Sequence, residues 1–246
     1  MSKHISQIEK NLETVSVILP SYNERDNIVE AINRISKSLG DQLLEIIVVD
    51  DDSPDETWSL VKELNHEKVN LIHRKEDKGL ASALADGVEK SRGEVVVWLD
   101  CDLGIPPEEI KNLIGYLKTY DVSIGSRYVK GGSDARAKWI TFSSTLINIL
   151  SRIMLSNEVK DYTSGFIAIK REVAENIKIN PQGFGEYFIE YTYRCIQEKY
   201  KIIEIGYPYG DRKGGVSKST DDFFVFIKLG VNYLKKLFYL FIKYKF

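Results

Sequence analysis

Short runs of apolar residues alternate with amphipathic stretches along the first hundred residues of the chain. The uninterrupted apolar runs predict buried strands over residues 15–19, 44–49, 69–72 and 94–99. Apolar residues at helical spacing predict helices between them, over residues 27–39, 56–64 and 79–91. Strands that alternate with helices indicate βαβ units with right-handed crossovers. We therefore predict an α/β fold with a mostly parallel central sheet flanked by helices.

The second half of the chain has a less regular order of elements. We predict strands over residues 122–124, 166–169 and 201–205. We predict helices over residues 106–120, 139–155 and 186–200, and polar loops over 131–136 and 210–220. These elements suggest an N-terminal extension (1–14), one α/β domain (15–220) and a basic amphipathic C-terminal helix (221–246).

Three polar clusters follow predicted strands directly. They are Pro20-Ser-Tyr-Asn-Glu24, Asp50-Asp-Asp52 and Asp100-Cys-Asp102. In a parallel sheet, ligands bind beyond the carboxyl ends of the strands, and these ends share one edge. We therefore expect the three clusters to meet at one rim.

Composition narrows the possible classes. The 246 residues include 43 % hydrophobic and 28 % charged residues, which excludes collagen-like, disordered and multi-span membrane proteins. A formal net charge of -2 provides no basic excess for nucleic-acid binding. The two cysteines, Cys101 and Cys195, cannot form a disulfide framework and fit a reducing compartment. The polar N-terminus predicts no secretory signal, and no long apolar run predicts a transmembrane helix.

The charge is distributed unevenly along the chain. Acidic residues concentrate in the segment Asp50–Asp55, whereas no acidic residue follows Asp222. Five lysines lie beyond that point: Lys228, Lys235, Lys236, Lys243 and Lys245. The two regions therefore suggest different ligands, which the net charge conceals.

Asp100 and Asp102 are the sharpest chemical feature. Two carboxylates one residue apart at a strand end can share Mg²⁺ or Mn²⁺, which prefer oxygen ligands and often bind substrate phosphates. Such a cation would neutralise a diphosphate leaving group. The alternative is a pair of acidic residues that cap the next helix.

The segment Asp50–Asp55 also allows two interpretations. A carboxylate can accept hydrogen bonds from a nucleobase or from ribose hydroxyls, and so many like charges indicate a binding site. Ser53 or Asp55 can also cap the following helix. We expect one aspartate to bind ligand and the others to form the turn.

Several common catalytic motifs are absent from the sequence. It has no G-x-G-x-x-G after the first strand, no G-x-x-x-x-G-K-[ST] and no G-x-S-x-G. The histidines His4, His66 and His73 are scattered and suggest no catalytic dyad. These absences argue against a dinucleotide oxidoreductase, a P-loop NTPase and a serine hydrolase.

The remaining motifs resemble those of family 2 glycosyltransferases of the GT-A fold, particularly dolichyl-phosphate mannose synthases and related polyprenyl-phosphate sugar transferases. Five segments carry the resemblance, in this order: Val15-Ser-Val-Ile-Leu-Pro-Ser-Tyr-Asn-Glu24, Ile47-Val-Val-Asp-Asp-Asp-Ser-Pro-Asp55, Lys78-Gly-Leu-Ala-Ser-Ala83, Asp100-Cys-Asp-Leu103 and Gly125-Ser-Arg-Tyr128. The resemblance covers about residues 15–220.

The resemblance implies roles for individual residues. The residues implied to contact the nucleotide-sugar are Pro20, Tyr22, Glu24, Val49, Asp51, Asp100, Cys101 and Lys218. Asp100 and Asp102 correspond to the metal-binding D-x-D, so Mg²⁺ or Mn²⁺ is the implied cofactor. Asp102, Arg127 and Arg212 are the implied catalytic residues, with Arg212 and Lys218 in a glycine-rich loop that closes over the phosphates.

The chain departs from the resembled pattern at two positions. Gly104 stands where related synthases often carry a glutamine that can ligate metal, and Gly214 replaces a second arginine of the basic loop. These differences leave GDP-mannose and UDP-glucose both open as donor types.

The implied reaction is an inverting displacement at the anomeric carbon of a nucleotide-sugar. A polyprenyl-phosphate acceptor is already anionic and needs no base, whereas a saccharide hydroxyl needs a carboxylate to remove its proton. Glu186, Glu190 and Asp161 are the candidate bases in the second case. A third possibility is a non-catalytic subunit that binds sugar nucleotides.

Two apolar segments suggest contact with a membrane. Residues 139–155 are rich in large apolar side chains with basic residues at the borders. In the C-terminal segment, one helical face is predicted to carry Phe223, Phe226, Ile227, Val231, Leu234, Leu237, Phe238 and Phe241, with lysines opposite. The alternative is a helix packed on its own domain or on a partner. We expect a protein on the cytoplasmic face of a membrane, bound to the lipid surface or to a membrane-anchored partner.

Overall fold

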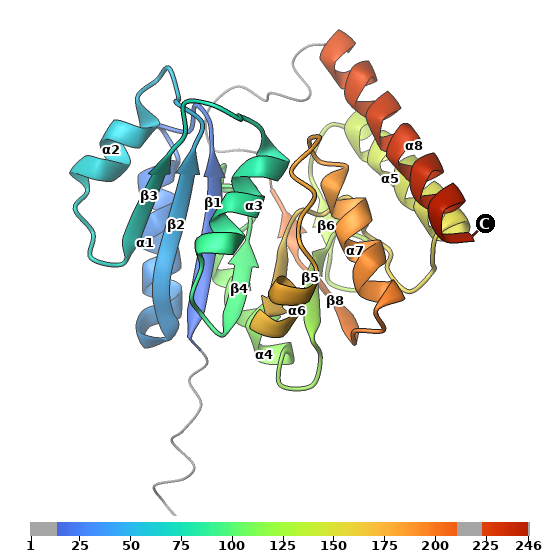
Figure 1. Ribbon diagram of the computed structural model, residues 1–246, viewed down its shortest axis with the longest axis horizontal. Helices are drawn as coiled ribbons and strands as arrows, with labels where there is room; N and C mark the ends of the chain where they lie inside the picture. The colour runs from blue at the N-terminus through green and yellow to red at the C-terminus, as the bar shows by residue number, and fades with distance from the viewer. Residues whose placement is uncertain (1–13, 211–222, 246) are drawn as a thin grey trace, which may run out of the picture.

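Strand β1 (Val15–Ser21) is buried along its whole length because helices cover both faces of its sheet. A computed structural model describes residues 14–210 and 223–245 and places β1 within a seven-stranded sheet (Figure 1). The spatial order is β3-β2-β1-β4-β7-β5-β8. The other strands of this sheet are β2 (Leu43–Asp50), β3 (Val69–His73), β4 (Val95–Trp98), β5 (Val122–Ser126), β7 (Ile167–Lys170) and β8 (Ile202–Gly206).

The helices form a layer on each face of the sheet. One layer contains α1 (Ile28–Leu39), α2 (Thr57–Glu63) and α4 (Ile110–Tyr116). The other contains α3 (Leu80–Lys90), α6 (Arg171–Asn176) and α7 (Tyr187–Gln197). Alternate residues of β1 enter opposite cores, with Val17 and Leu19 on the α1 side and Ile18 on the α3 side. The predicted α/β fold is confirmed.

The sheet is mostly parallel, as predicted. β1 pairs in parallel with β2 and β4, β2 with β3, and β5 with β8. β7 is antiparallel to both β4 and β5. It starts near the end of β5, where the Ser164 hydroxyl donates to the Gly125 carbonyl, and therefore runs back in the opposite direction.

Three local features differ from the sequence prediction. The short helix α6 was not predicted, and the helix expected over residues 106–120 is a 3₁₀ turn (Pro107–Glu109) followed by α4. The expected polar loop over 131–136 contains strand β6 (Ser133–Asp134), which pairs with β9 (Pro208–Tyr209). Two-residue strands depend on their partners and have no periodicity of their own.

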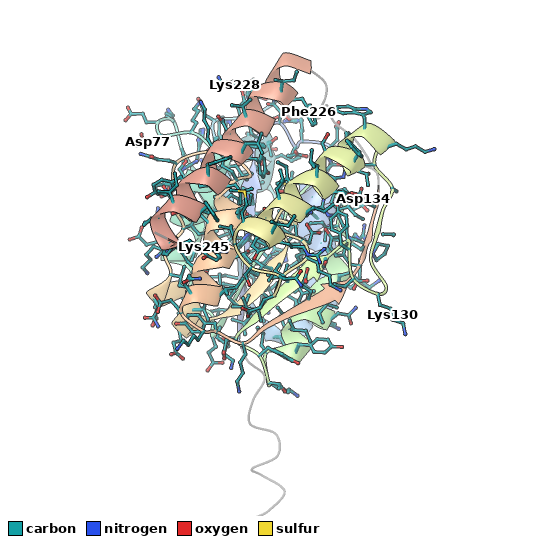
Figure 2. All side chains as sticks on the ribbon, turned by 90° about the vertical axis from the view of Figure 1, so that its right-hand side faces the viewer. Asp77, Lys130, Asp134, Phe226, Lys228 and Lys245 are labelled. Carbon is teal, nitrogen blue, oxygen red and sulfur yellow. The ribbon has the colours of Figure 1, made fainter. Side chains whose placement is uncertain are left out.

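Helices α5 (Lys138–Met154) and α8 (Phe223–Lys245) lie side by side on the outside of this layered core (Figures 1 and 2). The edge of the Trp139 ring contacts the Phe226 ring, with 4.7 Å between centroids. On its inner side, α8 buries Leu237 and Leu240 and packs against α7. Within the described ranges 14–210 and 223–245, none of the helices combines the length and hydropathy of a bilayer-spanning segment.

The prediction that the C-terminal helix carries a single apolar face is wrong in detail. Leu237 turns inward, while Ile227, Val231, Leu234 and Phe238 are exposed, together with Ile242. The chain folds α8 against α5 and α7, so this largely apolar helix has a buried and an exposed apolar side. The side chains of residues 223–225 lie outside the described residues.

Candidate active site

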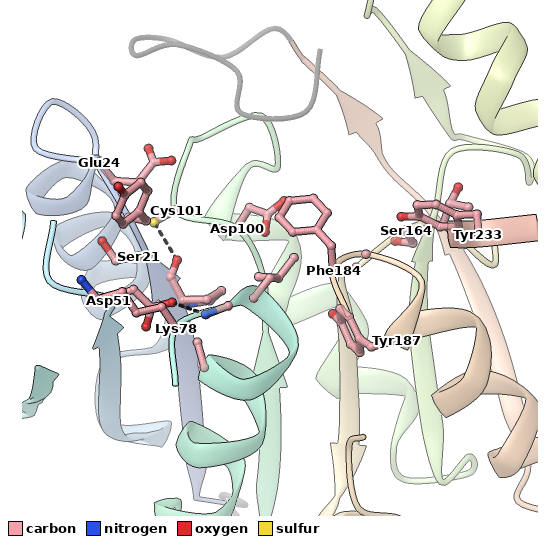
Figure 3. Close-up of a pocket in the computed structure, with 18 of the residues that line it drawn as sticks. Ser21, Glu24, Asp51, Lys78, Asp100, Cys101, Ser164, Phe184, Tyr187 and Tyr233 are labelled. Carbon is pink, nitrogen blue, oxygen red and sulfur yellow. Dashed lines mark hydrogen bonds between the residues drawn. The ribbon is translucent and has the colours of Figure 1, made fainter. Parts of the chain in front are cut away.

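The ends of β1, β2 and β4 meet at one rim, as the sequence predicts, and border a cavity of about 490 Å³ (Figure 3). Cavities of several hundred Å³ are typical of small-molecule sites. The predicted site residues that line it are Pro20, Tyr22, Glu24, Asp51, Asp100, Cys101 and Arg127. Val49 and Asp102 are buried and do not line it. Arg212 and Lys218 lie outside the described residues.

The three aspartates at the end of β2, Asp50, Asp51 and Asp52, make different contacts. Asp50 is buried and accepts hydrogen bonds from the backbone and hydroxyl of Ser53, which forms the turn. Asp51 lines the cavity. Asp52 points away to His73 and Lys78, whose hydrogen bonds lower the pKa of this exposed carboxyl. Asp50 forms the turn as the sequence suggested, whereas Asp52 bonds outside it, and the ligand role of Asp51 stays a prediction.

Asp51 is held in place by a residue that sequence reasoning missed. Arg74, directly after β3, donates from Nε to Asp51 Oδ1 at 2.8 Å, and its Nη2 donates to the same oxygen. The backbone N–H of Gly79 donates to Asp51 Oδ2 at 2.7 Å. Both Arg74 and Asp51 are buried. The carboxylate is therefore fixed in orientation at the cavity wall before any ligand binds.

Hydrogen bonds also fix the turn after β1. The Glu24 N–H donates to the Thr57 hydroxyl, and the Asn27 amide donates to Glu24 Oε2, both at 3.0 Å. The Cys101 thiol donates to the Pro20 carbonyl at 3.2 Å and so joins the ends of β4 and β1. Tyr22 remains partly exposed, so a flat aromatic surface stands at the mouth of this end. We call the part of the cavity around Tyr22, Glu24 and Asp51 the nucleotide end, after the nucleotide contacts that the sequence resemblance implies for these residues.

Asp100 and Asp102 differ in environment. Asp100 lines the middle of the cavity, between Cys101 and Phe184 (Figure 3). Asp102 is buried and its Oδ1 accepts the Gly104 N–H at 2.9 Å. Two neighbouring carboxylates offer hard oxygen ligands, and a divalent cation would complete its shell with donor phosphates and water. The residues present therefore fit such a cation, although the described residues contain no cluster of three or more metal-binding side chains.

The structure gives a reason for glycine at position 104. A Cβ on Gly104 would lie 3.1 Å from the Tyr209 ring and 3.2 Å from Asp102 Oδ1. Both distances are shorter than most Cβ contacts, so Tyr209 occupies the space into which a larger residue 104 would extend. The space next to the D-x-D is therefore filled by an aromatic ring and not by a third ligand from this position.

Arg127 and Asp161 form a buried ion pair. Its Nε and Nη2 donate to the two Asp161 oxygens at 2.9 and 2.7 Å, and Nη2 also donates to the Thr163 hydroxyl. Burial opposes ionisation of Asp161, but the charge and hydrogen bonds of Arg127 outweigh it and keep the pKa of this carboxyl below its usual value. The Arg127 side chain is thus held rigidly by Asp161 and Thr163 at the wall of the cavity that it lines.

Asn148 of α5 extends this network. Its amide group contacts Asp161 and Thr163, and its oxygen accepts the Tyr162 N–H at 2.8 Å. Helix α5 is therefore connected through Asn148 and Asp161 to the guanidinium of Arg127. The sequence carries no local signal for this connection because the residues are separated by 13 or more positions.

Further cavity residues were not assigned a role from the sequence. Arg136, just before α5, donates from Nε and Nη2 to Asp134 at 2.9 and 2.6 Å and lines the cavity. Its guanidinium lies over the Tyr209 ring, 5.1 Å from the centroid. Burial and the charges of Asp102 and Asp100 raise the pKa of Tyr209, so its phenol stays protonated. The other unassigned lining residues are Ser21, Lys78, Gly79, Leu80, Ala83, Thr163, Ser164, Gly165, Phe184, Gly185, Tyr187 and Tyr233.

The three candidate bases do not line the cavity. Asp161 is occupied by Arg127. Glu186 is buried and accepts the Phe184 N–H at 3.0 Å. Glu190 accepts from Lys236 Nζ at 2.5 Å and from Asn180. Among the described residues that line the cavity, the carboxylates are Glu24, Asp51 and Asp100.

Comparison with known families agrees with this geometry. Residues 16–178 match glycosyl transferase family 2. The chain belongs to this family. It is 43 % identical over 213 residues to the dolichol-phosphate mannosyltransferase of Pyrococcus furiosus, covering 83 % of this chain and 58 % of that protein. It is 35 % identical over 215 residues to the polyprenol monophosphomannose synthase of Mycolicibacterium smegmatis, covering 83 % and 80 %.

Solved structures support the GT-A fold of this family 2 chain. Glucosyl-3-phosphoglycerate synthase from Mycobacterium tuberculosis, crystallised with Mn²⁺, UDP and glucosyl-3-phosphoglycerate, superposes with a TM-score of 0.70. The match covers 92 % of this chain and 78 % of that one at 20 % identity. The chain spans a little over half of the length of the Pyrococcus relative, so the activity of that whole protein is not transferred with the fold.

Proposed function

We propose that this chain is a metal-dependent inverting glycosyltransferase that moves a hexose from a nucleotide-sugar to a polyprenyl phosphate. The observation that carries the proposal is the composition of the cavity end formed by Arg127, Arg136, Tyr209 and Tyr233, which we call the acceptor end. Among the described residues, two guanidinium groups line this end, whereas the carboxylates that pair with them, Asp161 and Asp134, do not line the cavity. Such a site suits an anionic acceptor that needs no base.

The nucleotide-sugar would bind along the rim from the nucleotide end toward Asp100. The fixed carboxylate of Asp51 would accept hydrogen bonds from the base or ribose, and Tyr22 would cover the base. The names of the two relatives support mannose as the sugar and polyprenol-type lipids as the acceptor. Donors that carry GDP and donors that carry UDP are both included in the transfer experiment below.

A divalent cation held by Asp100 and Asp102 would stabilise the negative charge that develops on the departing diphosphate. An acceptor phosphate oxygen would attack the anomeric carbon as the bond from that carbon to the donor diphosphate breaks. The nucleoside diphosphate would leave with the bonding electrons, and the configuration would invert. Arg127 and Arg136 would hold the acceptor phosphate in line and reduce its repulsion from the donor.

The proposal predicts lipid-linked product from the purified protein. Transfer from a panel of GDP- and UDP-sugars to a short polyprenyl phosphate should occur with one preferred donor, require Mg²⁺ or Mn²⁺ and stop on addition of a chelator. The measurement is radiolabelled sugar in the organic phase. Transfer to a saccharide hydroxyl without lipid product would overturn the acceptor assignment, and nucleotide binding without any transfer would favour a non-catalytic subunit.

We further propose that the exposed side of α5 and α8 lies on an anionic lipid surface. On α5 the exposed apolar side chains are Trp139, Phe142, Leu146, Ile149 and Ile153, and on α8 they are Ile227, Val231, Leu234, Phe238 and Ile242. We call these ten residues the apolar face (Figure 2 views this side). Their spacing of three or four residues forms a continuous stripe on each helix.

Charge favours lipid over a second protein on this face. Neither helix contains Asp or Glu, whereas exposed Lys138, Lys228, Lys235, Lys243 and Lys245 stand around the apolar face. Basic residues beside an apolar stripe suit an anionic membrane interface. The expected location is therefore peripheral, on the cytoplasmic face of a membrane, where a lipid-linked acceptor is available.

Replacing Phe142 and Phe238 with serine should weaken binding to anionic vesicles at least about tenfold, since each phenyl group contributes about 1.5–3 kcal/mol when it leaves water. Their side chains are 71 % and 59 % exposed, so the melting temperature should change little. Co-sedimentation with vesicles measures the effect. Tyr116→Ser, at an exposed aromatic on α4, is the matched control.

Vesicle binding by the double variant equal to that of the unmodified protein would contradict lipid contact at this face. A change of oligomeric state in the double variant, with vesicle binding unchanged, would assign the face to a second copy of the chain.

A further inference from the structure

Helix α8 contributes a side chain to the cavity as well as the apolar face on its outer side. Tyr233 lines the acceptor end and lies beside Ser164, on the opposite side of Asp100 from Glu24 and Asp51 (Figure 3). The neighbouring residues Val231 and Leu234 belong to the exposed stripe of the same helix. One helix therefore connects the proposed lipid contact with the interior of the site.

The position of the Tyr233 hydroxyl depends on Gly185. A Cβ on Gly185 would lie 2.0 Å from Tyr233 Oη and 3.1 Å from its Cζ. Real side chains do not approach so closely, so the phenol occupies the space that any larger residue 185 would need. Gly185 itself precedes α7 and lines the cavity. The hydroxyl is thus packed against the loop that forms one wall of the acceptor end.

Burial keeps the Tyr233 hydroxyl protonated. Burial is the main cause that raises the pKa of the phenol, and the nearby Glu186 and Asp100 charges add to it against the opposing charges of Arg127 and Arg136. A neutral phenol has a proton to donate throughout the ordinary pH range. Tyr233, Arg127 and Arg136 line the same cavity, and the charges of both guanidinium groups act on the phenol, so an anion attracted to them would meet this donor.

We propose that Tyr233 binds the phosphate of the polyprenyl-phosphate acceptor by donating a hydrogen bond from its hydroxyl, alongside Arg127 and Arg136. This inference rests on the proposed function. The nucleotide is a less suitable recipient because its fixed hydrogen-bond acceptor, Asp51, lies on the other side of Asp100 (Figure 3). A lipid held at the apolar face would also bring its headgroup to the helix that carries Tyr233.

The test compares Tyr233→Phe with Tyr244→Phe. Both tyrosines lie on the inner side of α8, but Tyr244 packs against the Tyr193 ring and does not line the cavity. Loss of one hydrogen bond to a charged group should raise the KM for farnesyl phosphate about tenfold in Tyr233→Phe. The KM for the nucleotide-sugar and the affinity for nucleotide with Mn²⁺, measured by calorimetry, should stay unchanged. Tyr244→Phe should match the unmodified protein in all three.

Gly185→Ala provides a second variant that leaves Tyr233 chemically intact. The added methyl group would displace the hydroxyl, so this variant should also raise the KM for farnesyl phosphate, and the two substitutions together should be less than additive. Thermal melts identify any variant that fails to fold.

The outcomes separate the two proposals. An unchanged KM and an unchanged calorimetric affinity for farnesyl phosphate in Tyr233→Phe would overturn the role of Tyr233 while leaving the proposed function in place. If Tyr233→Phe raised the KM for the nucleotide-sugar and left the KM for farnesyl phosphate unchanged, Tyr233 would be assigned to the donor. No binding or use of farnesyl phosphate by the unmodified protein, with transfer to a saccharide, would overturn the proposed function itself.

Discussion

Asp161→Asn is expected to destabilise the protein by about 3–5 kcal/mol, because the substitution leaves the Arg127 guanidinium buried without its counter-charge. Asp161 is fully buried and accepts from the Nε, Nη2 and backbone N–H of Arg127. The same change should release Arg127 from the acceptor end and lower transfer activity. Chemical denaturation at pH 7 measures the free energy of unfolding, and the activity is followed under conditions where the variant remains folded.

The destabilisation by Asp161→Asn is expected to depend on pH in a direction that the pKa of Asp161 determines. The pKa of Asp161 is lower in the folded state than in the unfolded chain, so its contribution to stability is present at neutral pH. That contribution is lost as the pH falls below about 4, the ordinary pKa of an aspartate. The difference in stability between the unmodified protein and Asp161→Asn should therefore shrink on acidification.

Asp86→Asn is the matched control for the ion pair. Asp86 also pairs with an arginine, Arg74, at 2.9 Å, but its side chain is 43 % exposed. The Asp86 carboxylate is partly solvated and Arg74 keeps its bonds to Asp51 when Asp86 is replaced, so the control should unfold nearly as the unmodified protein does. Equal effects of the two substitutions would show that the Arg127–Asp161 pair is not the buried anchor that its geometry indicates.

Asp100→Asn should lower sugar transfer by about 10²–10³-fold, because it removes a carboxylate at the point where the donor diphosphate would leave. Asp100 lines the cavity, whereas Asp102 is buried and bonded to Gly104. Asn at position 100 therefore tests the metal site with less risk to the fold than a change at Asp102. The rate of lipid-linked product formation across a Mn²⁺ titration measures the loss.

Asp41→Asn serves as the control, since Asp41 is exposed in the 3₁₀ turn before β2 and far from the ends of the strands that form the site. Nucleotide binding followed by calorimetry with and without Mn²⁺ gives a readout that does not depend on turnover. If Asp100→Asn retains full activity and the same dependence on Mn²⁺, the metal role of this residue is refuted.

The proposed function requires the cavity to bind two anions, and the charged groups at its two ends differ in a way that bears on this requirement. The nucleotide end presents carboxylates that are already satisfied, such as Asp51 with Arg74, while the acceptor end presents guanidinium groups anchored from behind by Asp161 and Asp134. Asp51, Arg127 and Arg136 are therefore each oriented by a charged partner that does not line the cavity. Preorganised charges of this kind need little rearrangement when substrate binds.

Much of the nucleotide end could be predicted from the sequence. The uninterrupted apolar runs of β1, β2 and β4 indicate buried parallel strands, and the carboxyl ends of such strands share one edge. Pro20 lies near the end of β1, Glu24, Asp51 and Asp100 follow shortly after β1, β2 and β4, and all four line the cavity. Helix α1 was equally predictable, since its buried residues recur at helical spacing.

The acceptor end depended on the tertiary structure. Arg136 and Tyr233 flank or belong to helices whose apolar pattern says nothing about a cavity, and Asp161 reaches Arg127 across 34 positions of sequence. The direction of β7 and the pairing of β6 with β9 likewise arise from contacts between distant segments.

Helix α8 shows the physical reason for this limit most clearly. Its sequence predicts a basic helix with a large apolar surface, but apolar residues occur on nearly all sides, so the hydrophobic pattern cannot select which side turns inward. Packing against α5 and α7 makes that choice, burying Leu237 and Leu240, exposing Val231 and Phe238, and directing Tyr233 into the cavity. Local sequence determined the strands and the polar residues at their ends, because those signals lie within a few consecutive residues. Only the packing of distant segments decided the acceptor end and the exposed side of the last helix.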